Sequence, residues 1–346
     1  MWQDLSLTVL IGAFLAAGAV IFLAGLRMTG LADKLADRTG LGEALIGGVL
    51  LGAATSLSGI VVSVTAALDG RSSLAFSNSV GGIAAQTVFL ALADMFHRRS
   101  NLEHAAADLG NVFQGITLMV LLTLPFLAMT TPEVAIWAVH PVTFVIPLAY
   151  ALGLVAGRQV QQSPMWTPVD TCDTKTDQPE EEDEETRKTS TTRLFLTFAL
   201  LMSLMGGAGY VIARTASELG DRAQVSDTLV GVLATAVVTS LPELVTTVAA
   251  VRRGALQLAV GGIIGGNTFD TLFLVASDVA YREGSLYHAV LPQDYFWIVS
   301  ALLMTGILIG GLILRQRRGP GRIGGESMLL LLIYAGSVAV QVLVAG

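Results

Sequence analysis

The feature that most constrains this chain is a 44-residue segment that occurs twice. Residues 55–98 align with residues 239–282 without a gap, at a constant offset of 184 positions, and 16 of the 44 aligned pairs are identical. Three other pairs place polar or acidic residues in the second copy against different residues in the first. These pairs are Glu243 with Gly59, Asn267 with Ile83, and Asp270 with Gln86. Duplicated apolar segments that hold a few acids are typical of ion transporters, so this difference bears on which ion is carried.

Composition indicates that the chain lies in a membrane. Of its 346 residues, 53% are hydrophobic and 14% are charged, whereas roughly 25% are charged in soluble domains. A crossing helix needs about 20 apolar residues, and lipid cannot hydrogen-bond an exposed backbone, so the spans should be helices. We therefore predict an all-α membrane protein with ten transmembrane helices, near residues 7–28, 43–68, 73–96, 111–129, 134–156, 193–214, 227–251, 256–280, 294–315 and 325–345.

Several other classes of protein are disfavoured. The first span follows only one early charge, Asp4, and is long, so we expect it to be retained rather than cleaved as a signal peptide. Cys172 is the only cysteine, which excludes an intrachain disulfide, and the four histidines lack metal-ligand spacing. We expect no enzyme activity, no resident cofactor and no nucleic-acid partner. The expected partners are inorganic cations and membrane lipid.

Charge in the loops predicts the domain organisation and the orientation. An acidic run at residues 180–185 marks residues 157–192 as a disordered linker between a first half, 1–156, and a second half, 193–346. With ten spans, the loops on the side of the termini carry four basic residues, and those on the other side carry sixteen. The positive-inside rule then places both termini outside and the linker in the cytoplasm. We expect a prokaryotic plasma membrane.

Counting spans between the two copies gives their relative direction. Equivalent points are five spans apart, and an odd number means that the second half inserts upside down. The sequence therefore predicts two inverted five-helix repeats, an arrangement common in alternating-access transporters. The repeated regions extend over about 43–98 and 227–282.

The seventh span contains the motif Thr239-Ser240-Leu241-Pro242-Glu243. Proline lacks an amide hydrogen and clashes with the preceding turn, so the helix should open just before Pro242. The freed carbonyls near Thr239 then suit a cation. Glu243 lies deep in the span, and the sequence offers no lysine or arginine in the seventh or eighth span to pair with it. We interpret it as a functional carboxylate rather than half of a structural ion pair.

The eighth span reads Gly265-Gly266-Asn267-Thr268-Phe269-Asp270. Asn267 and Asp270 are three residues apart and share a helical face. Carboxylate, amide, hydroxyl and carbonyl oxygens together suit hard cations such as Ca²⁺ or Na⁺. The glycine pair alone is better explained by close helix packing.

The first copy keeps oxygen-bearing residues without the acids. Thr55, Ser56 and Gln86 remain as neutral candidates in the second and third spans. Ser63 and Asn78 are better interpreted as partners in hydrogen bonds between helices.

The two motifs, TSLPE at 239–243 and GGNTFD at 265–270, resemble the α-repeats of the calcium/cation antiporter superfamily, which includes sodium/calcium exchangers. The resemblance covers both halves and implies a sodium/calcium exchanger-like fold with cations bound between spans 2, 3, 7 and 8. It implies these ligands: Glu243, Asp270, Asn267, Ser240, the Thr239 carbonyl, Thr55 and Ser56. Gln86, which aligns with Asp270, joins them as a neutral candidate.

The first repeat departs from that family. Gly59 and Ile83 stand where members usually have a glutamate and a polar residue. One acid fewer weakens divalent binding more than monovalent binding, because Coulomb attraction scales with the product of the charges. The leading hypothesis is a secondary antiporter that moves Ca²⁺ or another cation against Na⁺ or H⁺. Two alternatives remain: an exchanger of monovalent cations, and a transport-impaired or regulatory protein of the same fold.

Overall fold

The computed structural model describes residues 2–39, 55–97, 99–174, 190–319 and 323–345. These residues form helices joined by short loops, with a single isolated bridge between Ile136 and Val139 as their only β-type pairing. The predicted disordered linker, 157–192, is shorter in the structure, because residues 157–162 end a helix over Val142–Gln162 and residues 191–192 begin the next one, Thr191–Ala223. The acidic run at 180–185 lies outside the described residues.

The helices fall into two sets that are joined by residues 163–190. The first set, after a short 3₁₀ turn η1 (Trp2–Asp4), comprises α1 (Leu7–Thr39), α3 (Leu57–Leu68), α4 (Ser72–Asp94), α5 (Leu102–Ala105), α6 (Leu109–Thr130) and α7 (Val142–Gln162). The second set comprises α9 (Thr191–Ala223), α10 (Asp227–Leu229), the π-helical η3 (Val230–Thr235), α11 (Ala236–Thr239), α12 (Leu241–Arg253), α13 (Leu256–Ala280), α14 (Leu286–Ala289), α15 (Pro292–Leu314) and α16 (Gly325–Ala345).

The offset of 184 positions relates the described helices of the two sets from α1 to α16. Adding 184 to both bounds of α1 gives the bounds of α9, and adding it to those of α5 gives the bounds of α14. The other long pairs agree within two residues. The duplication is therefore far longer than the 44 residues whose identity reveals it.

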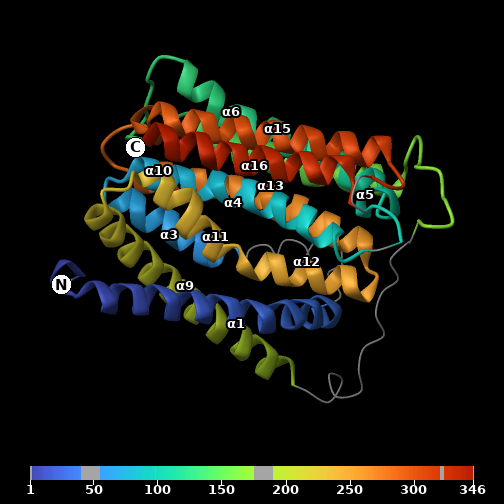
Figure 1. The fold of residues 1–346 in the computed structure, drawn as a ribbon, viewed down its shortest axis with the longest axis horizontal. Coiled ribbons are helices and arrows are strands. Elements are labelled where there is room, and N and C mark those ends of the chain that lie inside the picture. Colours follow the sequence, from blue (N-terminus) through green and yellow to red (C-terminus); the bar gives the residue numbers. More distant parts are fainter. Residues whose placement is uncertain (1, 40–54, 98, 175–189, 320–322, 346) are drawn as a thin grey trace.

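The two sets are inverted relative to each other. Helices α1 and α9 run in opposite directions along the long axis of the molecule, and so do α4 and α13 (Figure 1). This confirms the inverted arrangement predicted from the odd number of intervening spans.

Eight of the described helices are long and apolar enough to cross a membrane, and the bent pair Asp227–Thr239 and Leu241–Arg253 makes up to nine. Within the described residues α3 is a shorter apolar helix of 12 residues, and the start of its predicted span, 43–54, lies outside them. The predicted total of ten spans therefore stays a prediction.

The boundaries of the fifth predicted span were wrong. A helix was expected over 134–156, but α7 occupies Val142–Gln162. A tight turn with Trp137 and Ala138 at positive φ comes first, and such backbone conformations cannot form part of an α-helix. The apolar composition of 134–141 concealed this turn.

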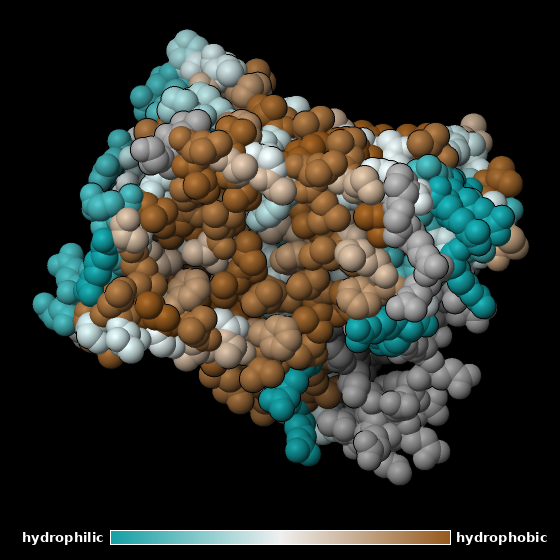
Figure 2. Space-filling model, viewed as in Figure 1, coloured by the Kyte–Doolittle hydropathy of each residue, from teal (hydrophilic) through white to brown (hydrophobic). Residues whose placement is uncertain are grey.

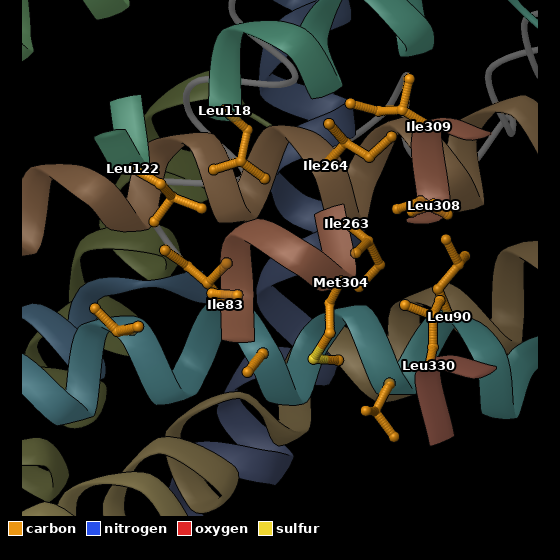
Figure 3. Packing of buried hydrophobic residues seen from close by; sticks show 14 of the residues in the cluster. Ile83, Leu90, Leu118, Leu122, Ile263, Ile264, Met304, Leu308, Ile309 and Leu330 are labelled. Carbon is orange, nitrogen blue, oxygen red and sulfur yellow. The ribbon is translucent and has the colours of Figure 1, made fainter. Parts of the chain in front are cut away.

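The helices α4 and α13 lie at the centre of the molecule (Figure 1). On one side they pack against α6, α15 and α16, and the buried side chains of these five helices interdigitate (Figure 3). On the other side lie α3, α11 and α12, with the pair α1 and α9 outermost (Figure 1). Every residue of α4 in its spanning window is buried.

The outer surface suits a bilayer. Hydrophobic side chains cover the middle of the face in Figure 2, and hydrophilic residues gather towards both ends of the helices. The lipid-facing helix α7 is only 11% buried over its spanning window although it is apolar. Such a surface is stable in hydrocarbon rather than in water.

Candidate functional site

Two helix breaks meet near the middle of the molecule. Helix α11 ends at Thr239 and α12 begins at Leu241, with Ser240 between them at φ −94° and ψ 4°. Helix α3 begins at Leu57, directly after Ser56 at φ −78° and ψ −5°. Adding 184 to 56 gives 240, so the two breaks occupy equivalent positions of the two repeats.

The break in the second repeat has the cause that was predicted from the sequence. Pro242 cannot donate to the carbonyl of Val238, four residues earlier, and the helix axis turns by 47° between the two segments. The break at Ser56 has no proline behind it, because Ser58 occupies the equivalent position. The Ser56 side chain instead donates to Asp270 of the other repeat.

Asp270 of α13 is the centre of the polar cluster at the breaks. Its Oδ1 atom accepts a hydrogen bond from the Ser56 hydroxyl at 2.7 Å, and its Oδ2 atom accepts one from Nε2 of Gln86 at 2.6 Å. The same Nε2 atom lies 3.3 Å from Oγ of Ser240. The two repeats therefore contribute jointly to a single cluster. In it, Gln86 of the first repeat donates to Asp270, its equivalent in the second repeat.

Glu243 adds a second carboxylate. Its side chain is 7% exposed, and Oε2 is buried without a hydrogen-bond partner. The Thr55 side chain hydrogen-bonds to it, and the Asp270 carboxylate is close enough to repel it. Within the described residues no third acidic, histidine or cysteine side chain completes a metal-ligand cluster here. Burial of two like charges favours binding of a compensating cation.

Two of the other predicted residues lie at the edge of this cluster. Nδ2 of Asn267 donates to Thr87 Oγ1 at 3.0 Å, and Oδ1 of Asn267 is buried without a partner. The Thr239 hydroxyl donates back to the Thr235 carbonyl at 2.9 Å, and the backbone carbonyl of Thr239 stays the candidate ligand that was predicted.

The second glycine of each glycine pair lines the cluster. A Cβ atom on Gly82 would lie 3.6 Å from Ser240 Oγ and 3.7 Å from Asp270 Oδ2, and one on Gly266 would lie 3.2 Å from Gln86 Oε1. The first glycine, Gly81, instead packs against the backbone of Val232. The interpretation of the pairs as simple packing is therefore incomplete.

A serine on α4 that the sequence interpretation missed also holds the cluster. Ser79 Oγ donates to the backbone carbonyl of Asp270 at 2.8 Å. Its spacing of seven residues from Gln86 places both residues on one face of α4, a periodicity that the sequence already contains.

Hydrophobic side chains surround Gly59 and Ile83, the two positions of the first repeat that align with Glu243 and Asn267. A Cβ atom on Gly59 would lie 2.5 Å from Cε2 of Phe273, so an aromatic ring occupies the space beside this glycine. Ile83 is fully buried in the cluster of hydrophobic side chains shared by α4, α6, α13 and α15 (Figure 3). Neither residue has a side-chain oxygen atom to offer to a bound ion.

The polar residues interpreted as structural behave as predicted. Asn78 Nδ2 donates to Ser63 Oγ at 2.9 Å and to the Gly59 carbonyl at 3.1 Å. These bonds fix α4 against α3 and confirm the expected hydrogen bond between helices.

Ion pairs gather at one end of the molecule. Arg71, just before α4, binds Asp227 and Asp221, both at 2.6 Å, and Arg214 pairs with Asp69. Burial alone would lower the pKa of Arg71, but the hydrogen bonds that its guanidinium donates to both aspartates outweigh it and raise that pKa above its ordinary value. These contacts tie the end of α9 to the loop between α3 and α4.

Comparison with known proteins gives consistent matches. A family model described as sodium/calcium exchanger protein matches residues 9–156 and 193–343. The putative antiporter CaxA of Alkalimonas amylolytica is 25% identical over 308 residues, which cover 88% of this chain and 90% of the relative. The inner membrane protein YrbG of Escherichia coli is 30% identical over 146 residues, so the match spans 40% of this chain and 44% of that relative.

Solved structures share the fold. The H⁺/Ca²⁺ exchanger CAX superposes with a TM-score of 0.68 at 12% identity, over 97% of this chain and 86% of that one. A structure of the sodium-calcium exchanger NCX_Mj superposes with a TM-score of 0.63 at 16% identity, over 96% and 99% of the two chains.

Proposed function

Because this chain belongs to the sodium/calcium exchanger protein family, we propose that it is a secondary antiporter that moves Ca²⁺ or another cation across the membrane against Na⁺ or H⁺. The proposed ligands are the carboxylates of Glu243 and Asp270. Ser56, Ser240, Thr55 and Gln86 support them, Asn267 lies at the edge, and the Thr239 carbonyl completes the set.

One observation carries this proposal. The Asp270 carboxylate is 2% exposed and receives the Ser56 hydroxyl and the Gln86 amide from the opposite repeat, while Glu243 Oε2 beside it has no partner. A structural network would satisfy each buried acceptor. A buried, unsatisfied carboxylate next to a second one is instead suited to a cation that comes and goes.

Charge balance supports exchange of different cations at one site. Two carboxylates neutralise either one Ca²⁺ ion or two monovalent ions. The loaded protein can then change conformation without uncompensated charge at the site. An empty site would leave two buried negative charges, which are costly inside a membrane. This cost disfavours movement of the empty carrier and so couples the two ion fluxes.

Access to the site depends on the helices α1 and α9. A Cβ atom on Gly25 of α1 would lie 2.5 Å from Cβ of Pro242, and one on Gly209 of α9 would lie 2.6 Å from the carbonyl oxygen of Ser58. Adding 184 to 25 and to 58 gives 209 and 242, so the two contacts are equivalent. Because these two glycines present no side chain, α1 and α9 can slide along Pro242 and Ser58. We propose that this movement opens the site to each side of the membrane in turn.

The proposed orientation follows the loop charges. The end that carries the Arg71 ion pairs faces outwards with both termini, and the end that carries α5 faces the cytoplasm. A prokaryotic inner membrane is the proposed location. The ion pairs at the Arg71 end would then lie on the outward side of the cation site.

Flux in proteoliposomes tests the proposal. We expect uptake of ⁴⁵Ca²⁺ that depends on an outward gradient of Na⁺ or H⁺ and stops when the gradient is collapsed. Uptake that follows membrane voltage without a trans cation would indicate a channel. Absence of gradient-driven flux of Ca²⁺, Na⁺ and H⁺ would favour the transport-impaired alternative, to which the filled positions beside Gly59 and at Ile83 point.

A further inference from the structure

The end of α4 carries a group of acids that the proposed exchange does not use. Asp94, Glu103 and Glu326 come from α4, α5 and α16, and they are 0%, 0% and 7% exposed. The group lies at the opposite end of α4 from Arg71. It therefore has no part in the cluster around Asp270.

Both carboxylate oxygens of Asp94 accept hydrogen bonds from backbone amides. Its Oδ1 atom accepts from the amide of Leu102 at 2.6 Å, and its Oδ2 atom accepts from the amide of Gly324 at 2.7 Å. These bonds hold the first turn of α5 and the start of α16 against the end of α4. This aspartate is therefore a structural cap.

The two glutamates are not satisfied in this way. Oε1 of Glu103 accepts from the Ser327 hydroxyl at 3.1 Å, but Oε2 of Glu103 and Oε1 of Glu326 are buried without a hydrogen-bond partner. A Cβ atom on Gly324 would lie 3.2 Å and 2.5 Å from these two oxygens. The oxygens therefore point to the same place and lie within 5.7 Å of each other, the sum of the two distances.

The inverted repeat supplies an internal control for this arrangement. At the opposite end, Asp278 accepts from the amides of Leu286 and His140, both at 2.8 Å, which are the positions equivalent to Leu102 and Gly324. There, however, the equivalents of the two glutamates are neutral. Adding 184 relates Glu103 to Tyr287 and Val142 to Glu326. The fold therefore needs the aspartate cap at both ends but does not need the pair of glutamates.

We propose that Glu103 and Glu326 together bind one proton, in a site at the α5 end of the protein that is separate from the cation site at Asp270. An ionised carboxylate has no donor, so the two groups can hydrogen-bond each other only when one of them is protonated. Proton sharing satisfies both orphaned oxygens and removes the repulsion between two buried like charges. A pair of carboxyl groups that shares one proton titrates as a unit.

The charged surroundings favour the protonated state. The charges that act on Glu103 from the elements packed against it are those of Asp94 on α4 and Glu326 on α16, and the nearest basic side chains along the chain, His104 and Arg315, are engaged elsewhere. The His104 ring is engaged by the Arg315 carbonyl at 2.6 Å, and the Arg315 guanidinium donates to the carbonyls of Val169 and His104. No ion pair within the described residues reaches either glutamate. Burial, with the negative charges of Asp94 and Glu326, raises the pKa of Glu103 well above its ordinary value.

The sign of the linkage follows from this shift. A carboxyl whose pKa is raised on folding contributes stability at acidic pH and loses it as the pH rises through the folded-state pKa. Loss of the proton leaves two carboxylates facing each other at the first turn of α16. Under the proposed orientation, alkaline cytoplasm would therefore loosen α16 from α5.

Infrared spectroscopy of the purified full chain tests the proton directly. At neutral pH we expect an absorbance of a protonated carboxylic acid that is lost in both Glu103→Gln and Glu326→Gln. The exposed acid Asp170 provides a control, and Asp170→Asn should leave the absorbance unchanged. Repeating the comparison in a Glu243→Gln background separates this site from the exchange site, because failure of transport would not alter the result. A wild-type spectrum without such a band, or a band that both variants keep, would overturn the proposal.

Stability against pH provides a second readout. We expect the melting temperature of the wild type to fall at alkaline pH more than that of Glu103→Gln, and the two curves to converge at acidic pH. Parallel curves would indicate a structural role only and would contradict the proposal. A band that is absent in Ca²⁺ and appears in a chelator would assign the site to a divalent cation instead and would also overturn it.

Discussion

The substitution Gln86→Glu changes the charge of the candidate site without changing its shape. In the wild type, Nε2 of Gln86 donates to Asp270 Oδ2 at 2.6 Å. Loss of a hydrogen bond to a charged group costs about 1.5–3 kcal/mol. Two carboxylates about 4 Å apart repel each other by about 4 kcal/mol at an effective dielectric constant of about 20. The empty, fully ionised variant would therefore lose about 6 kcal/mol of folding free energy.

Binding a proton gives the empty variant a state of lower free energy. Protonating an ordinary glutamate at pH 7 costs about 4 kcal/mol, which is less than that loss. We therefore expect the empty Gln86→Glu site to hold a proton that a cation displaces. Ca²⁺ gains about twice as much as Na⁺ from the added charge, so its affinity should rise about tenfold or more relative to Na⁺. The absolute gain in Ca²⁺ affinity should be smaller at pH 7 than at pH 8, because a larger share of the empty site then holds the proton.

Equilibrium binding of ⁴⁵Ca²⁺ in detergent at pH 7 and 8, with Na⁺ as competitor, measures this change. Gln341→Glu is a matched control, because Gln341 is also buried, at 2% exposed, but lies on α16. The control should be destabilised without any gain in Ca²⁺ affinity. An unchanged ratio of Ca²⁺ to Na⁺ affinity in Gln86→Glu would refute the assignment of this residue to the site.

Three further predictions follow from contacts elsewhere. Gly209→Ala places a methyl group 2.6 Å from the Ser58 carbonyl and should slow exchange while ⁴⁵Ca²⁺ binding persists. The control Gly207→Ala, whose methyl group would meet nothing within 4 Å, should exchange at the wild-type rate. Equal exchange rates for the two variants would contradict the proposed movement of α9. Gly59→Ala meets the Phe273 ring and should cost about 1–3 kcal/mol in thermal unfolding, and addition of Phe273→Leu should recover part of this loss; no recovery would show that the ring is not the obstacle. Burial and the neighbouring His288 lower the pKa of His140 below 6.5, so stability should fall as the pH drops below that value, and His140→Gln should flatten this part of the melting curve; a curve of unchanged slope would argue against it.

The sequence was sufficient for the features that repeat symmetry and backbone chemistry dictate. Alignment of the two copies indicated the inverted halves, and Pro242 indicated the break after Thr239. The grouping of Ser56, Gln86 and Asp270 follows from the same symmetry, because equivalent breaks in inverted repeats meet near the centre.

The remaining features depend on tertiary contacts that local sequence does not encode. Ser56, just before α3, donates its hydroxyl to Asp270 of α13, which is 214 residues away in the sequence. The Phe273 ring fills the space beside Gly59 only because α3 and α13 pack together. The turn at Trp137 and Ala138 interrupts an apolar stretch whose composition resembles that of a span. The full extent of the repeat also became visible only from helix bounds, since most equivalent residues differ.

The most direct test of the exchanger assignment compares Na⁺-driven and H⁺-driven ⁴⁵Ca²⁺ uptake by proteoliposomes that contain wild type, Glu243→Gln or Glu283→Gln. Glu283 is an exposed acid outside the site and controls for the loss of one charge. We predict gradient-driven uptake in the wild type and in Glu283→Gln, and no uptake in Glu243→Gln although that variant folds normally. Uptake by Glu243→Gln at the wild-type rate would contradict the assignment of this carboxylate to the transported ion.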